Sequence, residues 1–223
     1  MNQSIIGISS FPKYFEPYIR FLRAKLSPVR FKHCVDVGLA MGKAFNVYGN
    51  NPPFDPHGRD DWMLSGLVHD VMKEASVQTM RWWIEKYSPD ELSLIPPSMQ
   101  DHHVYMHGPA GSVFVRHALG IRRSGTFHEA IAHHVGCYEA MSLLARCLNV
   151  ADMTQPAERY RGCDKLGRIF FGGDLNSAEL LLSAWTKEFF EQIRFPVHPA
   201  FEPKIAKMTK LLKPAPEFFS REG

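Results

Sequence analysis

The sequence DDWMLSGLVHDVMKE, which runs from Asp60 to Glu74, decides the fold and the chemistry that we predict for this chain. Its apolar residues recur at the spacing of one helix face; they are Leu64, Leu67, Val68 and Val71. The stretch therefore predicts a helix over 60–74 that packs one side against a core. Gly66 would let the backbone of another element approach this helix closely.

His69 and Asp70 are adjacent in this stretch. Neighbouring side chains on a helix point about 100° apart, so both can serve one ion only at the edge of the helix. A His-Asp pair is also a common structural feature, and its meaning depends on the residues that accompany it.

Helical patterns extend along nearly the whole chain, with caps such as Ser27-Pro28 and the capping-box pairs Ser88/Glu91 and Thr126/Glu129. We expect helices over 27–47 and 60–74, one from Ser88, one from His107-Gly108-Pro109 to about Leu119, and others over 126–134, 138–152, 174–193 and 203–212. No credible strand series, internal repeat or low-complexity segment accompanies them. The predicted fold class is all-α.

The composition narrows the class of protein. The chain has 223 residues, 45% of them hydrophobic, and a net charge of +3, which is too small to indicate binding to a nucleic-acid polymer. No apolar run reaches the ~20 residues of a membrane span, and the N-terminus carries no recognisable leader. We therefore expect a cytoplasmic protein with no membrane contact. Its four cysteines are expected to be reduced; they are Cys34, Cys137, Cys147 and Cys163.

Two further residues are predicted to point inward toward the His-Asp pair. His33 shares a helix face with Val37, and Asp152 shares one with Leu148. A buried carboxylate without a partner costs several kcal/mol or loses its charge. Each residue alone has a structural interpretation, His33 as a core histidine and Asp152 as a helix cap. Together with His69 and Asp70 they form a mixed nitrogen and oxygen set that suits iron, manganese, zinc or cobalt.

The order His33, His69-Asp70, Asp152 resembles the signature of the HD-domain metal-dependent phosphohydrolases. The wider context is similar to the YqeK-type symmetrical diadenosine tetraphosphate hydrolases. The motifs that carry this resemblance are Arg30–His33, Gly66–Lys73, His107-Gly108, Ala130–Gly136 with His133 three before Gly136, and Ala151-Asp152 followed by Pro156. The resemblance covers residues 27–166, and residues 167–223 form a C-terminal helical extension of what we expect to be a single HD-type domain over 1–223.

The resemblance implies an HD-domain helical bundle with additional C-terminal helices. It also implies one or two bound divalent ions, with iron as the first choice. It implies that His33, His69, Asp70 and Asp152 are the metal ligands and that His107 and His133 face the phosphates or help to hold a second ion. The implied reaction is cleavage of dinucleoside tetraphosphate to two nucleoside diphosphates. The expected substrate contacts also include Lys73 and Arg159, and the expected catalytic residues are Asp70, Lys73, His107 and His133.

Elementary chemistry suggests how three of these residues could act. We expect His107 at a helix start, where free backbone N–H groups favour a phosphate. Lys73 lies one turn from Asp70 and can neutralise charge on the leaving diphosphate, or it is simply an exposed lysine. His133 or a water molecule would protonate the leaving group.

Several alternatives stay open at the level of the sequence. His134 could turn inward in place of His133. The segment Gln155–Arg159 departs from the Glu-Pro-x-Arg pattern of the family, which leaves the substrate open. Rival functions are another HD-type nucleotide phosphatase, a cyclic-nucleotide phosphodiesterase (although its Gly-Tyr-Pro signature is absent) or a non-catalytic nucleotide-sensing module. The C-terminal extension could form a wall of the pocket or the interface of a homodimer.

Overall fold

A computed structural model describes residues 7–50, 58–135, 138, 140–155 and 162–211. Over these residues the chain is helical and contains no strand, which confirms the predicted all-α class. The α-helices are α1 (Glu16–Lys25), α2 (Pro28–Ala44), α3 (Arg59–Val68), α4 (Val77–Tyr87), α5 (Asp90–Ser93), α6 (His103–His117), α7 (Gly125–Ala132), α8 (Leu143–Met153), α9 (Cys163–Phe171), α10 (Leu175–Gln192) and α11 (Phe201–Leu211). Short 3₁₀ helices cover Ile8–Ser10, Lys13–Phe15 and Pro97–Met99, and a π-helical turn, Phe45–Gly49, follows α2.

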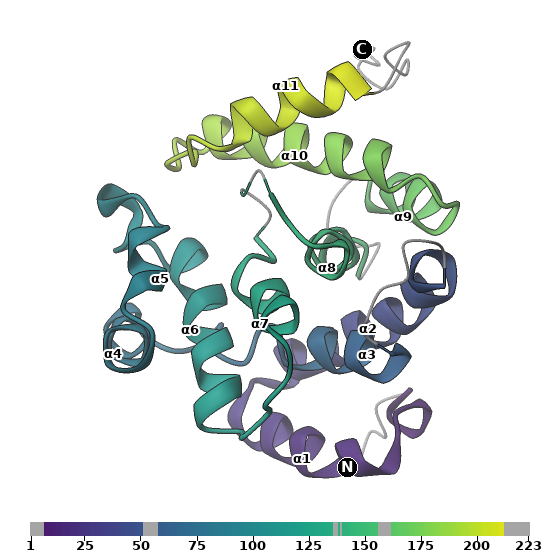
Figure 1. The fold of residues 1–223 in the computed structure, drawn as a ribbon, viewed down its shortest axis with the longest axis vertical. Coiled ribbons are helices and arrows are strands. Elements are labelled where there is room, and N and C mark those ends of the chain that lie inside the picture. The colour runs from purple at the N-terminus through teal and green to yellow at the C-terminus, as the bar shows by residue number, and fades with distance from the viewer. Residues whose placement is uncertain (1–6, 51–57, 136–137, 139, 156–161, 212–223) are drawn as a thin grey trace.

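The helices pack around a centre formed by α2, α3, α7 and α8 (Figure 1). Helix α2 packs along α3 and against α8, while α7 bridges α6 and α8. Helices α10 and α11 lie across the top of the view in Figure 1, and α10 packs on α8 and α9. None of the described helices is long and apolar enough to cross a membrane.

Two glycines bring the central helices into contact at backbone distance. A Cβ atom on Gly66 of α3 would lie 2.8 Å from the carbonyl oxygen of Val37 and 2.9 Å from the Cα of Gly38, both in α2. A Cβ atom on Gly108 of α6 would lie 2.5 Å from the carbonyl oxygen of Ala132 in α7. The close approach predicted at Gly66 therefore occurs, and a second one joins α6 to α7.

The predicted helix over 60–74 is wrong at its C-terminal end, because α3 stops at Val68. His69 Nδ1 lies 2.7 Å from the carbonyl oxygen of Gly66, which is the acceptor that a continued helix would offer to the amide of Asp70. Beyond this point the backbone forms shorter turns, from the amide of Val71 to the carbonyl of Val68 and from the amide of Lys73 to that of Asp70. His69 and Asp70 thus lie on a turn rather than within a helix.

Other helices also begin at residues that differ from the predicted ones. Helix α6 begins at His103, so Pro109 lies inside it and His107 is not at a helix N-terminus. Helix α7 is capped by Ser124 rather than Thr126, and α8 by Ser142, four residues after the predicted start at Tyr138. Ser88 ends α4 instead of capping α5. In α7 and α8 the hydroxyl of the capping serine accepts a hydrogen bond from the backbone amide three residues later in the chain. This bond fixes the start of each helix.

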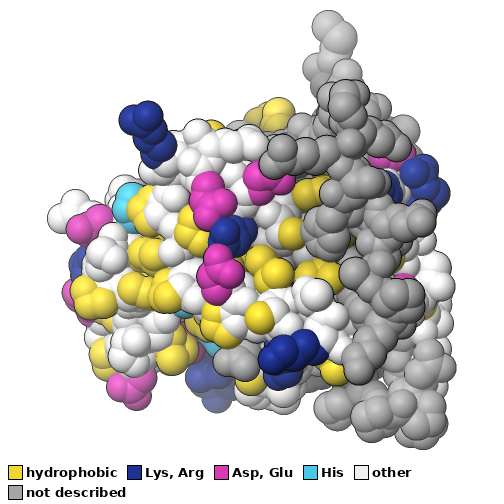
Figure 2. All heavy atoms as spheres, turned by 90° about the horizontal axis from the view of Figure 1, so that it is seen from above, with side chains coloured by type: hydrophobic (Ala, Val, Ile, Leu, Met, Phe, Trp, Pro, Cys, Tyr) yellow, Lys and Arg dark blue, Asp and Glu magenta, His cyan; other side chains and the backbone are white. Residues whose placement is uncertain are grey.

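The predicted C-terminal helices are found at α10 and α11. Asp174 caps α10, because its Oδ1 accepts a hydrogen bond of 3.0 Å from the backbone amide of Ser177. Helix α9 was not predicted, although its periodicity buries Leu166 and Phe170. Figure 2 looks onto the face formed by the last helices, where hydrophobic side chains lie between charged ones.

Replacing Gly66 with alanine should destabilise the protein by about 1–3 kcal/mol, because the added methyl group overlaps the backbone of α2. Urea unfolding followed by circular dichroism measures this change. Gly125→Ala is the matched control, since no atom lies within 4 Å of its Cβ position, and it should leave stability unchanged or raise it by up to about 1 kcal/mol. Equal stability of the two variants would contradict the close approach of α2 and α3.

His128 is a buried histidine of α7, and its side chain is only 3% exposed. Burial, assisted by the charge of Arg116, lowers its pKa from 6.5 to about 4. The unfolded chain therefore takes up this proton at a higher pH than the folded protein does. The corresponding stability is fully present above about pH 6.5 and is lost as the pH falls toward 4.

The variant His128→Asn removes this contribution. Between pH 6.5 and 4 the free energy of unfolding of metal-free protein should fall less steeply in the variant, by at most about 1.4 kcal/mol per pH unit. Urea unfolding at several pH values provides the measurement. Parallel curves for the two proteins would show that the pKa of His128 is the same in the folded and the unfolded chain.

Candidate metal centre and cavity

The centre of the site is the turn that follows α3. The hydrogen bond from His69 Nδ1 to the carbonyl oxygen of Gly66 places the ring proton on Nδ1, so the Nε2 lone pair faces inward. Nε2 lies 3.5 Å from Asp70 Oδ2 and 3.4 Å from Asp152 Oδ1. A lone pair that faces two carboxylate oxygens is repelled by them unless a proton or a metal ion lies between the three atoms.

Helices α2 and α8 complete this group of ligands. His33 Nε2 of α2 lies 2.8 Å from Asp152 Oδ1 and 3.7 Å from Asp70 Oδ2. His33 is 5% exposed and Asp70 1%. The side chain of Asp152 remains 20% exposed at the last turn of α8. The four predicted ligands therefore lie together, and both His33 and Asp152 point inward as expected.

The donor atoms fit a metal ion. Four buried atoms of the group make no hydrogen bond, namely Nδ1 and Nε2 of His33, Nε2 of His69 and Oδ1 of Asp70. Two sets of donor atoms lie within 4.8 Å of one another, one from His33, His69 and Asp152 and the other from His69, Asp70 and His134. Imidazole with carboxylate is the ligand chemistry of iron, manganese, cobalt and zinc. These buried groups could hold one or two such ions.

The second carboxylate oxygen of Asp70 faces α6 and the end of α7. Asp70 Oδ1 lies 3.3 Å from His107 Nε2 and 3.5 Å from His134 Nε2. Each ring places Nδ1 near a backbone carbonyl, His107 at 3.1 Å from that of His103 and His134 at 2.8 Å from that of Ile131. The two Nε2 atoms are 2.9 Å apart, within hydrogen-bond distance, and which of them donates depends on the tautomers of the rings. Both nitrogens face the same oxygen of Asp70, where a proton or a metal ion can lie between them and the carboxylate.

The charges of the site keep its carboxylates ionised. Burial acts to raise the pKa of Asp70, but His69 and Lys73, with the adjacent His107 and His134, hold that pKa well below its usual range. In the same way His33 and His69 overcome the effect of burial and lower the pKa of Asp152. Burial and the charge of Lys73 lower the pKa of His107 to about 3, so its imidazole is neutral at physiological pH.

The structure brings His134, rather than His133, into the group. His134 is 1% exposed, whereas the ring of His133 stacks on Tyr138 at a centroid distance of 3.8 Å. The prediction for His107 is correct in part. Its side chain reaches the group, but the residue lies within α6 and not at the start of a helix. Lys73 lies at the site, with Nζ 3.0 Å from His107 Nε2 and 3.9 Å from Asp70 Oδ1. Arg159 lies outside the described residues.

Two residues of the site were given no role on sequence grounds. Arg30 Nη1 lies 2.5 Å from Asp70 Oδ2, and it stands one helical turn before His33, so its position on the same face was a signal. Asn149 is one turn before Asp152 and donates from Nδ2 to the carbonyl oxygen of His134 at 2.8 Å. Asn149 thereby fixes the backbone of the segment that carries His134.

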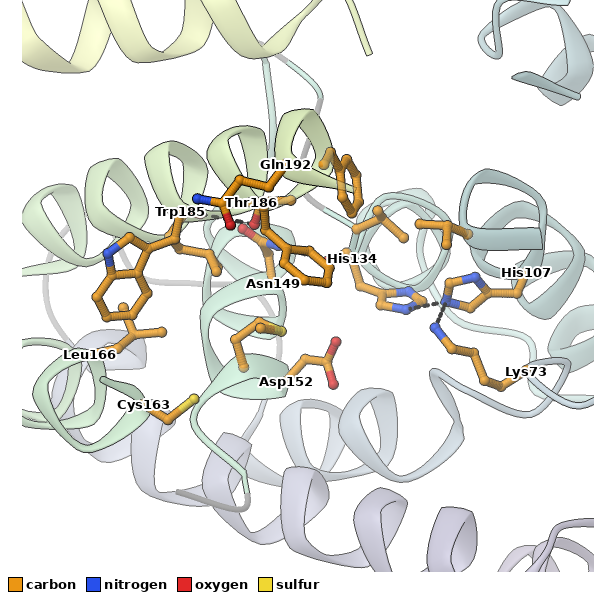
Figure 3. A pocket seen from close by; sticks show the side chains of 16 residues that line it. Lys73, His107, His134, Asn149, Asp152, Cys163, Leu166, Trp185, Thr186 and Gln192 are labelled. Atoms are coloured by element: carbon orange, nitrogen blue, oxygen red, sulfur yellow. Dashed lines mark hydrogen bonds between the residues drawn. The ribbon is translucent and has the colours of Figure 1, made fainter. Parts of the chain in front are cut away.

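A cavity of about 470 Å³ opens from the charged group (Figure 3). Figure 3 shows Lys73, His107 and His134 at one end and Trp185 with Leu166 at the other, with Asp152 between them. The volume lies within the range of small-molecule pockets. Helices α9 and α10 supply much of the wall, so the C-terminal extension contributes to the pocket as one of the two sequence interpretations expected.

The fold and the site define a class of protein. A solved structure from Clostridium acetobutylicum, described as a predicted HD superfamily hydrolase involved in NAD metabolism, aligns with a TM-score of 0.77. It covers 91% of this chain and 100% of its own at 21% identity. This chain therefore has the fold of an HD superfamily hydrolase. No protein-family model matches it.

Two curated proteins are similar to this chain in sequence. A symmetrical bis(5'-nucleosyl)-tetraphosphatase of Halalkalibacterium halodurans is 24% identical over 182 residues, which are 81% of this chain and 89% of that protein. The protein of the same name from Bacillus subtilis is 25% identical over 137 residues, 61% of this chain and 69% of its own. The resemblance predicted from the motifs is thereby confirmed.

Substituting the two adjacent histidines separates their roles. His134→Gln should remove one bound ion or weaken metal binding by more than about tenfold, because Nε2 of His134 faces Asp70. His133→Gln is the matched control and should leave both the number of ions and their affinity unchanged. Titration of metal-free protein with Mn²⁺ or Co²⁺ gives both quantities. The reverse pattern would place His133 at the metal.

Proposed function

We propose that this chain is a metal-dependent hydrolase of phosphoanhydride bonds in nucleotides, and that it cleaves dinucleoside tetraphosphate symmetrically to two nucleoside diphosphates. The observation that carries the proposal is the group of inward lone pairs and ionised carboxylates at one end of a nucleotide-sized cavity. The names of the two curated relatives support the choice of substrate. The HD-type fold supports the reaction class.

In this proposal His33, His69, Asp70 and Asp152 hold a divalent ion, with iron as the first choice and manganese, cobalt or zinc as alternatives. Asp70 and His134 are the groups left to hold a second ion, since the Nε2 lone pair of His107 accepts the hydrogen bond of Lys73. A bound divalent ion supplies a Lewis acid for a phosphate oxygen and lowers the pKa of a bound water from 15.7 to roughly 7.

The chain's own charges suit a polyphosphate. Asp70 and Asp152 are balanced by Arg30 and Lys73, so these four groups sum to zero before any ion binds. Each divalent ion then makes the end of the cavity positive, which favours an anionic substrate. Arg30 stays on Asp70 Oδ2 and orients that carboxylate, while Lys73 lines the cavity.

His107 and Lys73 act as a pair. The neutral ring of His107 accepts a hydrogen bond from Lys73 Nζ, which directs the ammonium group toward Asp70 and the cavity. Lys73 can then neutralise charge that develops on the leaving diphosphate. His107, with its pKa near 3, does not serve as the proton donor at neutral pH.

The proposal is tested by incubating diadenosine tetraphosphate with protein loaded with Fe²⁺, Mn²⁺ or Co²⁺ and resolving the products by chromatography. ADP should be the sole nucleotide product. AMP with ATP would exclude symmetrical cleavage. Absence of turnover with all three metals would favour a nucleotide-sensing module, while release of inorganic phosphate from mononucleotides would favour the phosphatase alternative.

Asp70→Asn should lower the rate of hydrolysis by more than about 100-fold, because it removes a charged ligand that faces both groups of histidines. Asp164→Asn is the matched control, because Asp164 is an exposed residue of α9 that pairs with Arg168. Circular dichroism checks that both variants fold. Equal activities would show that Asp70 has no part in catalysis.

A further inference from the structure

The two ends of the cavity differ in chemistry. Among the described lining residues the charged ones are Lys73, at the metal end, and Asp152, which lies between the two ends (Figure 3). The wall that α9 and α10 supply is largely apolar and aromatic, formed by Leu166, Leu182, Trp185, Phe189 and Phe190. A polyphosphate alone would use only the charged end. The apolar end therefore needs an occupant that is itself apolar and joined to phosphate.

The aromatic wall follows from the periodicity of α10. Leu182, Trp185, Thr186 and Phe189 are spaced by three, one and three residues, which places them on one face of the helix. Phe189 is 48% exposed even though it lines the cavity. Burying an aromatic ring is favourable, so a ligand that covers Phe189 gains binding energy from it.

The Trp185 ring is held in place before any ligand binds. Gly162, the N-cap of α9, has a φ of +99°, and a Cβ atom there would lie 2.6 Å from Cη2 of Trp185. Only glycine combines this backbone conformation with the close approach of the ring. Trp185 is thus a preorganised surface, which reduces the entropy lost when a flat ligand stacks on it.

The polar side chains near this wall already donate hydrogen bonds to other groups of the protein. Thr186 Oγ1 donates to the carbonyl oxygen of Leu182 at 2.9 Å, and Gln192 Nε2 donates to Glu188 Oε1 at 3.3 Å. Asn149 Nδ2 donates to the carbonyl of His134. The wall is accordingly better suited to the face of a base than to its edge.

We propose that the apolar end of the cavity is a nucleobase subsite in which Trp185 and Phe189 of α10 contact the face of the base, so that the pocket accepts either purine. This inference rests on the proposed function, because it assumes that the phosphates lie at the metal end. Every base offers a π-face, so recognition by stacking tolerates changes of base. The C-terminal helices then select a nucleotide over a phosphate chain that has no base.

The test measures binding to Mn²⁺-loaded protein by calorimetry, with ADP, GDP and inorganic tripolyphosphate as probes. Trp185→Ala should weaken binding of ADP and GDP by roughly 5- to 150-fold and leave tripolyphosphate unchanged. Phe189→Ala should act in the same direction, and because this ring is half exposed its loss leaves no buried cavity. Trp185→Phe should restore most of the affinity for ADP.

Trp82→Ala is the matched control, since this tryptophan of α4 is 49% exposed and does not line the cavity. Equal weakening of ADP and tripolyphosphate by both α10 variants would mean that the rings only support the fold, and it would overturn the subsite. A difference of more than about tenfold between ADP and GDP would overturn recognition by the face of the base. These binding results do not depend on turnover, so they remain distinct from a failure of the proposed hydrolysis.

Discussion

The site depends on one constraint, which is that a fully buried carboxylate, Asp70, must remain charged. Burial alone would protonate this group, and the chain prevents this by surrounding it with cationic and imidazole groups from several elements. Arg30 comes from α2, Lys73 from the turn after α3, His107 from α6 and His134 from the end of α7. Asp70 therefore joins most of the central helices through a single side chain.

This convergence is possible because the helix backbones come very close together. Gly66 permits α3 to lie against α2, which brings His33 toward His69, and Gly108 permits α6 to lie against Ala132, two residues before His134. The early end of α3 contributes as well. The turn that carries His69 and Asp70 has i→i−3 hydrogen bonds, so its successive side chains are about 120° apart rather than the 100° of a regular helix.

The sequence was sufficient for the all-α class and for the meeting of His33, His69, Asp70 and Asp152, because burial patterns and helical spacing are local signals. It was insufficient for His133 and His134. Helix α7 ends at Ala132, so helical periodicity could not decide between the two. The start of α6 was missed for a similar reason, because Pro109 lies inside the helix rather than in its first turn.

The cavity draws its two ends from separate parts of the chain. The groups around the candidate ions lie between Arg30 and Asp152, whereas the aromatic wall lies between Leu166 and Phe190. Under the proposed subsite, substitutions in α9 and α10 would alter ligand choice while every candidate metal ligand stays in place. The two ends could therefore evolve separately. Related chains could keep the same group of metal-binding side chains and change which ligand they select through their last helices alone.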